Sequence, residues 1–171
     1  MEVFYQHEAN GDGWTWAHFD VASRQTKQWF GSQGGIEPHV VEALLFEETR
    51  PRATRFASGT LIILRGVNLP PASVPTDMIS IRLWVEKHRI ISRRIRRLLS
   101  VRAIRERCER NDAPVSVGDF LVDINVGLIE CIAGVVQTLE DEIDELEAIT
   151  ITKPFSLVRA RLADERQKLF R

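Results

Sequence analysis

Cysteine is scarce in this chain, and the two that occur, Cys108 and Cys131, stand alone without a CxxC spacing. Two isolated cysteines are too few for the disulfide framework of a small secreted protein. The first residues also lack the basic start and apolar core of a signal peptide. No stretch approaches the ~20 apolar residues that span a bilayer. These absences predict a soluble chain in a reducing compartment.

Catalytic motifs are absent as well. The sequence contains no GxGxxG, no phosphate-binding P-loop, no nucleophile elbow and no HExxH, so no motif nominates an enzymatic reaction. The 23 basic and 24 acidic residues give a formal charge of -1, which selects neither nucleic acid nor an anionic membrane as a partner. With 171 residues, 44% of them hydrophobic, the chain can bury at least one core.

The first two thirds of the chain mix strand and helix signals. Aromatic and β-branched residues predict a strand at Trp14 to Val21, which a short helix follows. The next helix contains Pro38 in its first turn and ends at Pro51, with Val40, Val41, Leu44 and Leu45 on one face. Further strands are predicted in "ATRF", "TLIILRGVNL" and "MISIRLWVEKHRIISRR", the last a hairpin that turns near Glu86 to Arg89. A helix then runs from about Arg93 to Arg110.

Two of these strands carry opposite burial patterns. In "SIRLWVE" the apolar Ile81, Leu83 and Val85 alternate with other residues, which predicts a sheet with one face in the core. In "LIIL" all four residues are apolar, which predicts a strand that is covered on both faces.

The last third is helical. Ser116 and Asp119 form a capping box, and apolar residues then recur every three or four positions to Leu146. Some thirty residues of helix extend ~45 Å, and "TKP" at Thr152 to Pro154 ends them. A further helix, "SLVRARLADERQKLFR", reaches the end of the chain without a cap, as if cut in mid-helix. The pattern therefore predicts an α+β fold with three α/β/α layers: a domain at 1–112 and a helical extension at 113–171.

The acidic segment, Leu139 to Glu147, holds six carboxylates and no basic residue: Glu140, Asp141, Glu142, Asp144, Glu145 and Glu147. One interpretation is a half-buried helix with Leu139, Ile143 and Leu146 inward and a solvated acidic side. The other is a surface that attracts hard cations. One helix cannot wrap an ion, so diffuse attraction fits better than a tight site.

The basic segment, Lys87 to Arg110, holds ten lysines and arginines against two glutamates. It could bind phosphate groups of a nucleic acid, but no nucleic-acid motif accompanies it. Pairing with acidic surfaces of the same protein, or of a second copy, is the simpler use. A free-standing module that binds an acidic or nucleic-acid partner through this segment stays open as the alternative function.

The four histidines, His7, His18, His39 and His88, show no metal-ligand spacing with one another or with a cysteine. A zinc site built locally is therefore not predicted. A site assembled across chains stays open.

Four stretches, in this order, resemble one family. "GGIEPHVVEALLFEETRPRATRF", "LIILRGVNLPP", "SIRLWVEKHRIISRR" and "LEDEIDELE" are similar to the amino-terminal cytoplasmic domain of CorA-type divalent cation transporters, and most of all to the ZntB zinc-transporter branch. The resemblance runs from about Trp14 to the last residues.

The resemblance implies a mixed sheet between helical layers, followed by long antiparallel helices. It further implies a homopentamer that forms a funnel on the cytoplasmic side of the inner membrane. Membrane-spanning helices with a Gly-Met-Asn signature would anchor it, and they lie outside this chain. The ion transported or sensed would be Zn²⁺ or Mg²⁺. The protein would not be an enzyme, and no resident cofactor is implied.

One position departs from the magnesium-transporting members. The resemblance places an acidic ligand for regulatory ions on the helix at Glu37 to Glu47, and the aligned residue here is Ala43. The neighbouring Glu42 would project about 100° away on a helix. Magnesium-gated closure is therefore not expected.

Overall fold

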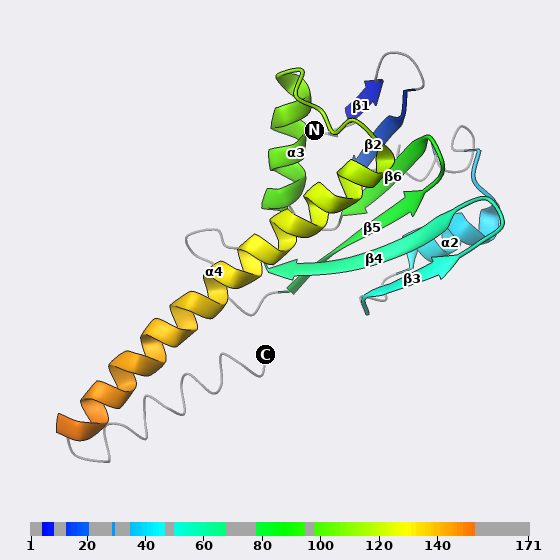
Figure 1. Cartoon of the computed structure of the whole chain (residues 1–171). Helices are drawn as coiled ribbons and strands as arrows, with labels where there is room; N and C mark the ends of the chain where they lie inside the picture. The colour runs from blue at the N-terminus through cyan, green and yellow to red at the C-terminus, as the bar shows by residue number, and fades with distance from the viewer. Residues whose placement is uncertain are drawn as a thin grey trace. The chain divides into compact units, whose positions relative to one another are not determined.

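The computed structural model describes residues 5–8, 13–20, 29, 35–46, 50–67, 78–94 and 98–152 (Figure 1). The chain divides into two compact units. The first comprises Met1–Arg65 and Ile79–Gly127, and the second comprises Gly66–Met78 and Leu128–Arg171. The short helix predicted after the first strand and the helix predicted near the end of the chain lie outside the described residues, apart from Trp29, which is helical.

A six-stranded sheet has the order β1-β2-β6-β5-β4-β3. Its strands are β1 (Tyr5–Glu8), β2 (Thr15–Asp20), β3 (Arg52–Arg55), β4 (Thr60–Val67), β5 (Met78–Val85) and β6 (Arg89–Arg94). β2 and β6 pair in parallel, whereas the β1–β2, β3–β4 and β5–β6 pairs are antiparallel. The sheet is therefore mixed, as the resemblance implies. β1 was not predicted, since its four residues carry a weak alternating signal.

Helix α2 (Pro38–Leu45) covers one face of this sheet (Figure 1). Its Val40 and Leu44 are fully buried in a cluster with residues from four strands: Ala17, Phe19, Leu61, Trp84 and Ile91. Val41 and Leu45 are half-buried against the same cluster, which confirms the predicted apolar face. The helix ends at Leu45, earlier than the predicted stop at Pro51, because Phe46 already has extended dihedral angles of φ -65° and ψ 144°.

Aromatic side chains mark the opposite face of the sheet. Trp16 alternates with Ala17 along β2 and therefore points away from α2. Its ring lies 4.9 Å from that of Phe120, which also contacts Trp14 at 5.5 Å. Phe120 belongs to the long helix α4 (Val117–Thr152). The sheet thus has helices on both faces, which confirms the layered α+β prediction.

This two-sided cover corrects the prediction for β5. The sequence favoured one buried and one exposed face, yet Arg82 and Trp84 are as fully buried as Ile81 and Leu83. The alternation of apolar and polar residues in β5 did not predict burial, because Arg82 is buried although it is charged. β4 fits its prediction more closely, since Leu61 and Ile63 are buried and Ile62 and Leu64 are half-buried.

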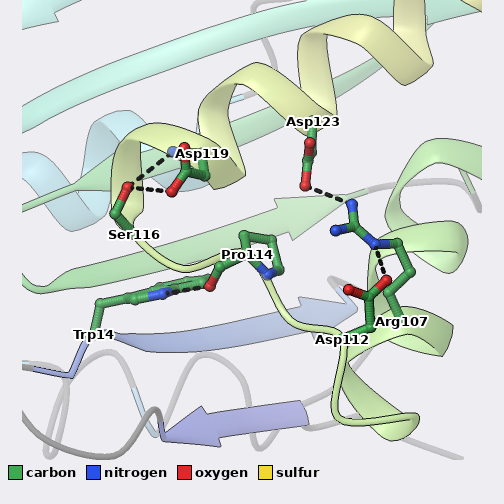
Figure 2. A network of polar contacts seen from close by, with 7 residues as sticks. All are labelled: Trp14, Arg107, Asp112, Pro114, Ser116, Asp119 and Asp123. Atoms are coloured by element: carbon green, nitrogen blue, oxygen red, sulfur yellow. Dashed lines mark hydrogen bonds and ion pairs between the residues drawn. The ribbon is translucent and has the colours of Figure 1, made fainter.

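Helix α3 (Leu99–Glu109) follows β6 and is shorter at its start than predicted, because β6 continues to Arg94. The polar "NDAP" stretch ends it, and Asn111 adopts the left-handed φ of 59° that asparagine tolerates. Trp14 Nε1 donates a hydrogen bond of 2.9 Å to the carbonyl of Pro114 in this connection (Figure 2).

Helix α4 begins with the predicted cap. Ser116 Oγ accepts a 3.1 Å hydrogen bond from the backbone N–H of Asp119 and donates one of 2.8 Å to the Asp119 carboxylate (Figure 2). The helix continues for 36 residues, about 54 Å. Among the residues that the structure describes, none of the helices combines the length and apolarity that a membrane crossing demands.

Candidate cation-attracting surface

All six carboxylates of the acidic segment lie on α4. The helix carries nine aspartates and glutamates over its 36 residues and no lysine or arginine. Like charges at neighbouring helix positions repel one another, so this composition weakens the helix unless its apolar side is packed. Stability of α4 must therefore come from burial of the other side.

Packing within the second unit provides that burial. Leu128, Val135 and Leu146 are buried along α4. Leu128 lies so close to Gly66 that a β-carbon at Gly66 would come 2.4 Å from Leu128 Cδ2. A larger residue at Gly66 would force the Leu128 side chain to move. These contacts fix which side of the helix faces inward.

The carboxylates occupy the side that remains. Glu140, Asp141, Asp144, Glu145 and Glu147 are exposed, whereas Glu142 is half-buried. At 3.6 residues per turn, the five exposed residues span roughly 160° of the circumference. The interpretation as a half-buried helix with a solvated acidic side is confirmed in outline.

Ile143 departs from that interpretation. It was predicted to point inward with Leu139 and Leu146, but its side chain is 50% exposed, while Leu139 is half-buried and Leu146 is 6% exposed. Ile143 sits at the border between the buried side and the carboxylates, because a 3.6-residue period carries it away from the centre of the buried stripe.

The acidic segment carries negative charge but does not form a defined metal-binding site among the described residues. Within the part of the chain that the structure describes, no three His, Cys, Asp or Glu side chains converge as metal ligands would. Asp141 accepts a hydrogen bond of 3.2 Å from Gln137 Nε2, a neighbour on the same helix. The geometry therefore permits diffuse attraction of cations, and the six residues remain a predicted surface.

The basic segment differs from the acidic one, because several of its arginines form ion pairs with carboxylates of the same chain. The four pairs on α3 and the β5–β6 turn are Arg89–Glu86 at 2.7 Å, Arg102–Glu106 at 2.6 Å, Arg105–Glu109 at 3.1 Å and Arg110–Glu106 at 3.8 Å. Pairing within the protein, the simpler of the two predicted uses, is what these contacts show. They also reduce the positive field that a phosphate backbone would meet.

Arg107 shows the same pairing at the junction of α3 and α4. Its Nε lies 2.9 Å from Asp112 and its Nη1 lies 2.6 Å from Asp123 on α4 (Figure 2). The hydrogen bonds that Arg107 donates to Asp112 and then to Asp123 raise the pKa of its guanidinium. One guanidinium thus ties the end of α3 to the second turn of α4.

Two further arginines of the basic segment, Arg93 and Arg94, are buried in β6. Arg93 donates a hydrogen bond to the carbonyl of Leu44 at the end of α2, where the negative end of the helix dipole favours a cation. Burial, then the charges of Arg94 and Arg105, lower the pKa of His18 to about 3. His18 is therefore neutral at pH 7, with its Nδ1 2.7 Å from Ser92 Oγ.

The remaining histidines differ in setting. His88 is exposed in the β5–β6 turn, and the side chain of His7 lies outside the described part of the chain. His39 Nε2 lies 3.2 Å from Glu37 Oε2 at the start of α2. Sequence reasoning did not single out this pair, since residues two apart on a helix do not face each other; Glu37 meets His39 because it precedes the helix.

Ala43 lies on the inward side of α2. It is half-buried against the core cluster, whereas Glu42 is exposed. The two side chains therefore point in different directions, as the sequence predicted, and Glu42 does not replace a ligand at position 43.

Comparison with known proteins shows the family of the chain. Residues 11–171 match the family model described as CorA-like Mg2+ transporter protein. The zinc transport protein ZntB of Cronobacter sakazakii is 32% identical over 132 residues, which are 77% of this chain and 40% of that protein. The divalent cation transporter CmaX of Pseudomonas aeruginosa is 30% identical over 135 residues, 78% of this chain and 41% of that protein.

The fold has solved counterparts. The crystal structure of the ZntB cytoplasmic domain from Vibrio parahaemolyticus aligns with a TM-score of 0.75 at 23% identity, covering 85% of this chain and 66% of that one. The chain spans about 40% of the length of the curated relatives it matches.

Proposed function

The chain belongs to the CorA-like Mg2+ transporter family, and from this premise we propose that it forms the cytoplasmic domain of a divalent cation transporter. The observation that carries the proposal is the match of 11–171 to the family model. The fold shared with a ZntB cytoplasmic domain supports it. Zn²⁺ is the favoured cargo, since the relatives include zinc transport proteins, and Mg²⁺ is the second candidate.

Three roles follow for the domain. It assembles the transporter as a homopentamer on the cytoplasmic side of the inner membrane, it attracts cations and it regulates transport. It performs no catalysis of its own. Three large apolar side chains on α4 are at least 46% exposed: Ile129, Val136 and Ile143. Such a series of exposed apolar side chains is typical of surfaces that pack against another protein. This supports the assembly role.

Cation attraction is proposed for the acidic segment. Five exposed carboxylates with no basic residue on the same helix give a negative potential that raises the local cation concentration. Such attraction falls with salt, since the Debye length shrinks from about 30 Å at 0.01 M to about 10 Å at 0.1 M.

A transport assay tests this role. In a transporter that contains this domain, Asp141, Glu142, Asp144 and Glu145 are replaced by amides, and uptake is measured at low and high ionic strength. We expect slower uptake at low salt and a much smaller difference at high salt. A control replaces Glu42 and Glu130, which are exposed acidic residues outside the acidic segment. If the variant and the parent took up cations at equal rates at both ionic strengths, the acidic segment would not attract cations.

The coding sequence beyond Arg171 tests the membrane role. We expect a further helix, a Gly-Met-Asn signature and two apolar segments of ~20 residues. A stop codon directly after Arg171 would contradict the transporter proposal and favour the free-standing module. That alternative is weakened by the intrachain pairs of the basic segment.

A further inference from the structure

Glu37 and His39 bring an imidazole nitrogen and a carboxylate oxygen together at the solvent. His39 Nε2 lies 3.2 Å from Glu37 Oε2, and the two side chains are 56% and 46% exposed. Glu37 is the residue before the first turn of α2, and Pro38 separates the pair. Both donor atoms are therefore accessible to an ion from solution.

Neighbouring residues orient each member of this pair. Ser58 Oγ donates a hydrogen bond of 3.0 Å to Glu37 Oε1, so the other carboxylate oxygen is the one that faces His39. The ring of His39 lies 5.5 Å from that of Phe56 at an angle of 38°. Phe56 and Ser58 both belong to the β3–β4 turn, which the bond from Phe56 N to Gly59 O holds at 2.8 Å. Supporting contacts of this kind position metal ligands in proteins.

The separation of the two atoms suits a shared metal ion. Zinc binds histidine nitrogen at about 2.0–2.1 Å and carboxylate oxygen at about 2.0–2.2 Å in tetrahedral geometry, which sets neighbouring ligand atoms roughly 3.3 Å apart. The observed 3.2 Å matches this value. An ion would take the place of this ion pair once the imidazole nitrogen and the carboxylate oxygen turn towards a common point.

We propose that Glu37 and His39 bind Zn²⁺ or a similar borderline divalent cation, with water in the remaining coordination positions. An imidazole with a carboxylate suits such metals, whereas Mg²⁺ prefers oxygen alone. The described part of the chain contains no set of three metal-ligating side chains, so within that part the site has two protein ligands. It is separate from position 43, where Ala43 is half-buried and offers no ligand.

Other candidate ligands in the described residues are less available. His18 is 2% exposed and contacts Ser92 through Nδ1. His88 is exposed, but the carboxylate two residues before it, Glu86, is bound by Arg89 at 2.7 Å. Burial and then the charge of Glu130 raise the pKa of the Cys131 thiol, which keeps it protonated and a poor ligand at neutral pH. His88 therefore provides a matched control for His39.

Zinc titration of the 171-residue chain tests the site, by calorimetry and by competition with a coloured chelator at pH 7.5. Thiols are kept reduced with a phosphine that does not bind zinc. We expect one site, with at least about tenfold weaker binding in His39→Ala and in Glu37→Gln. Ser58→Ala should weaken binding by about tenfold, the lower end of what loss of a supporting contact costs. His88→Ala and added Mg²⁺ should have no effect.

The opposite results would overturn the proposal. They are the absence of zinc binding, an unchanged affinity in both His39→Ala and Glu37→Gln, or loss of the site in Cys131→Ser. Because both ligand residues are about half exposed, their variants should keep the circular dichroism of the parent chain. The test needs no transport activity, so its result is independent of the proposed function.

Discussion

The basic segment and the acidic segment are similar in the sequence and opposite in the structure. Each concentrates one sign of charge over a short stretch. The arginines of the basic segment that the structure describes lie in the sheet or form ion pairs with carboxylates of the same chain. Five carboxylates of the acidic segment are exposed on a helix without basic residues. Charge density along a chain therefore does not reveal whether the charge is available to a partner.

The largest expected effect comes from Arg93→Ala. Arg93 is 3% exposed and hydrogen-bonded to the Leu44 carbonyl, so its loss removes a buried charge-assisted bond and leaves a cavity. We expect the free energy of unfolding to fall by about 3 kcal/mol, measured by urea denaturation with tryptophan fluorescence. Arg102→Ala, an exposed member of the same segment, should cause no measurable change. If both substitutions lowered the free energy of unfolding equally, the buried Arg93 would contribute no more to stability than the exposed Arg102.

Acid should destabilise the fold through His18. Its folded-state pKa of about 3 lies below the ordinary value of 6.5, so below pH 6.5 the unfolded chain binds the extra proton. Stability is complete above pH 6.5 and is lost as the pH falls towards 3. Between pH 7 and pH 5 the free energy of unfolding should fall by about 2 kcal/mol through His18. The loss should disappear in His18→Gln and persist in His88→Gln; the same pH dependence in all three proteins would assign it to other groups.

A smaller effect is expected at the α3–α4 junction. Arg107→Ala removes ion pairs to Asp112 and Asp123 that are partly exposed, and such pairs contribute about 1 kcal/mol or less. The free energy of unfolding should drop by that amount at 10 mM salt and by less at 500 mM. A double-mutant cycle with Asp123→Asn isolates the interhelical pair. A coupling energy of zero would mean that Arg107 does not join the helices energetically.

The smallest effect is expected for the acidic segment. Replacing Asp141, Glu142, Asp144 and Glu145 by amides relieves repulsion between carboxylates three and four residues apart. We expect a change below about 0.5 kcal/mol, in the stabilising direction at low salt, by the same urea titration. A clear loss of stability would indicate that these charges hold the fold together, and the contrast with the basic segment would then fail.

Much of the fold was predictable because its elements carry strong local signals. The β5–β6 hairpin, the Pro38 start of α2 and the Ser116 cap of α4 all lie where the sequence predicts them. Turn residues, caps and apolar periodicity act over a few residues, so a single chain shows them. β1 and the early end of α2 were missed, since pairing with β2 and the extended Phe46 depend on the rest of the molecule.

The candidate sites were predictable to different degrees. The acidic segment is visible in the sequence, but its exposure depends on which side of α4 the contact between Leu128 and Gly66 turns inward. The pair of Glu37 and His39 has no sequence signature. It arises because the β3–β4 turn brings Ser58 and Phe56 to the start of α2.

By itself, the sequence determined the family resemblance, the order of most helices and strands, and the position of each charged segment. Tertiary structure decided which arginines are buried or paired with another helix. The physical reason is that a charge is stabilised by whatever surrounds it: a carboxylate or a carbonyl for the arginines of β6 and α3, and water for the acidic side of α4. For Arg93 and Arg107 the partners, Leu44 and Asp123, lie on helices α2 and α4.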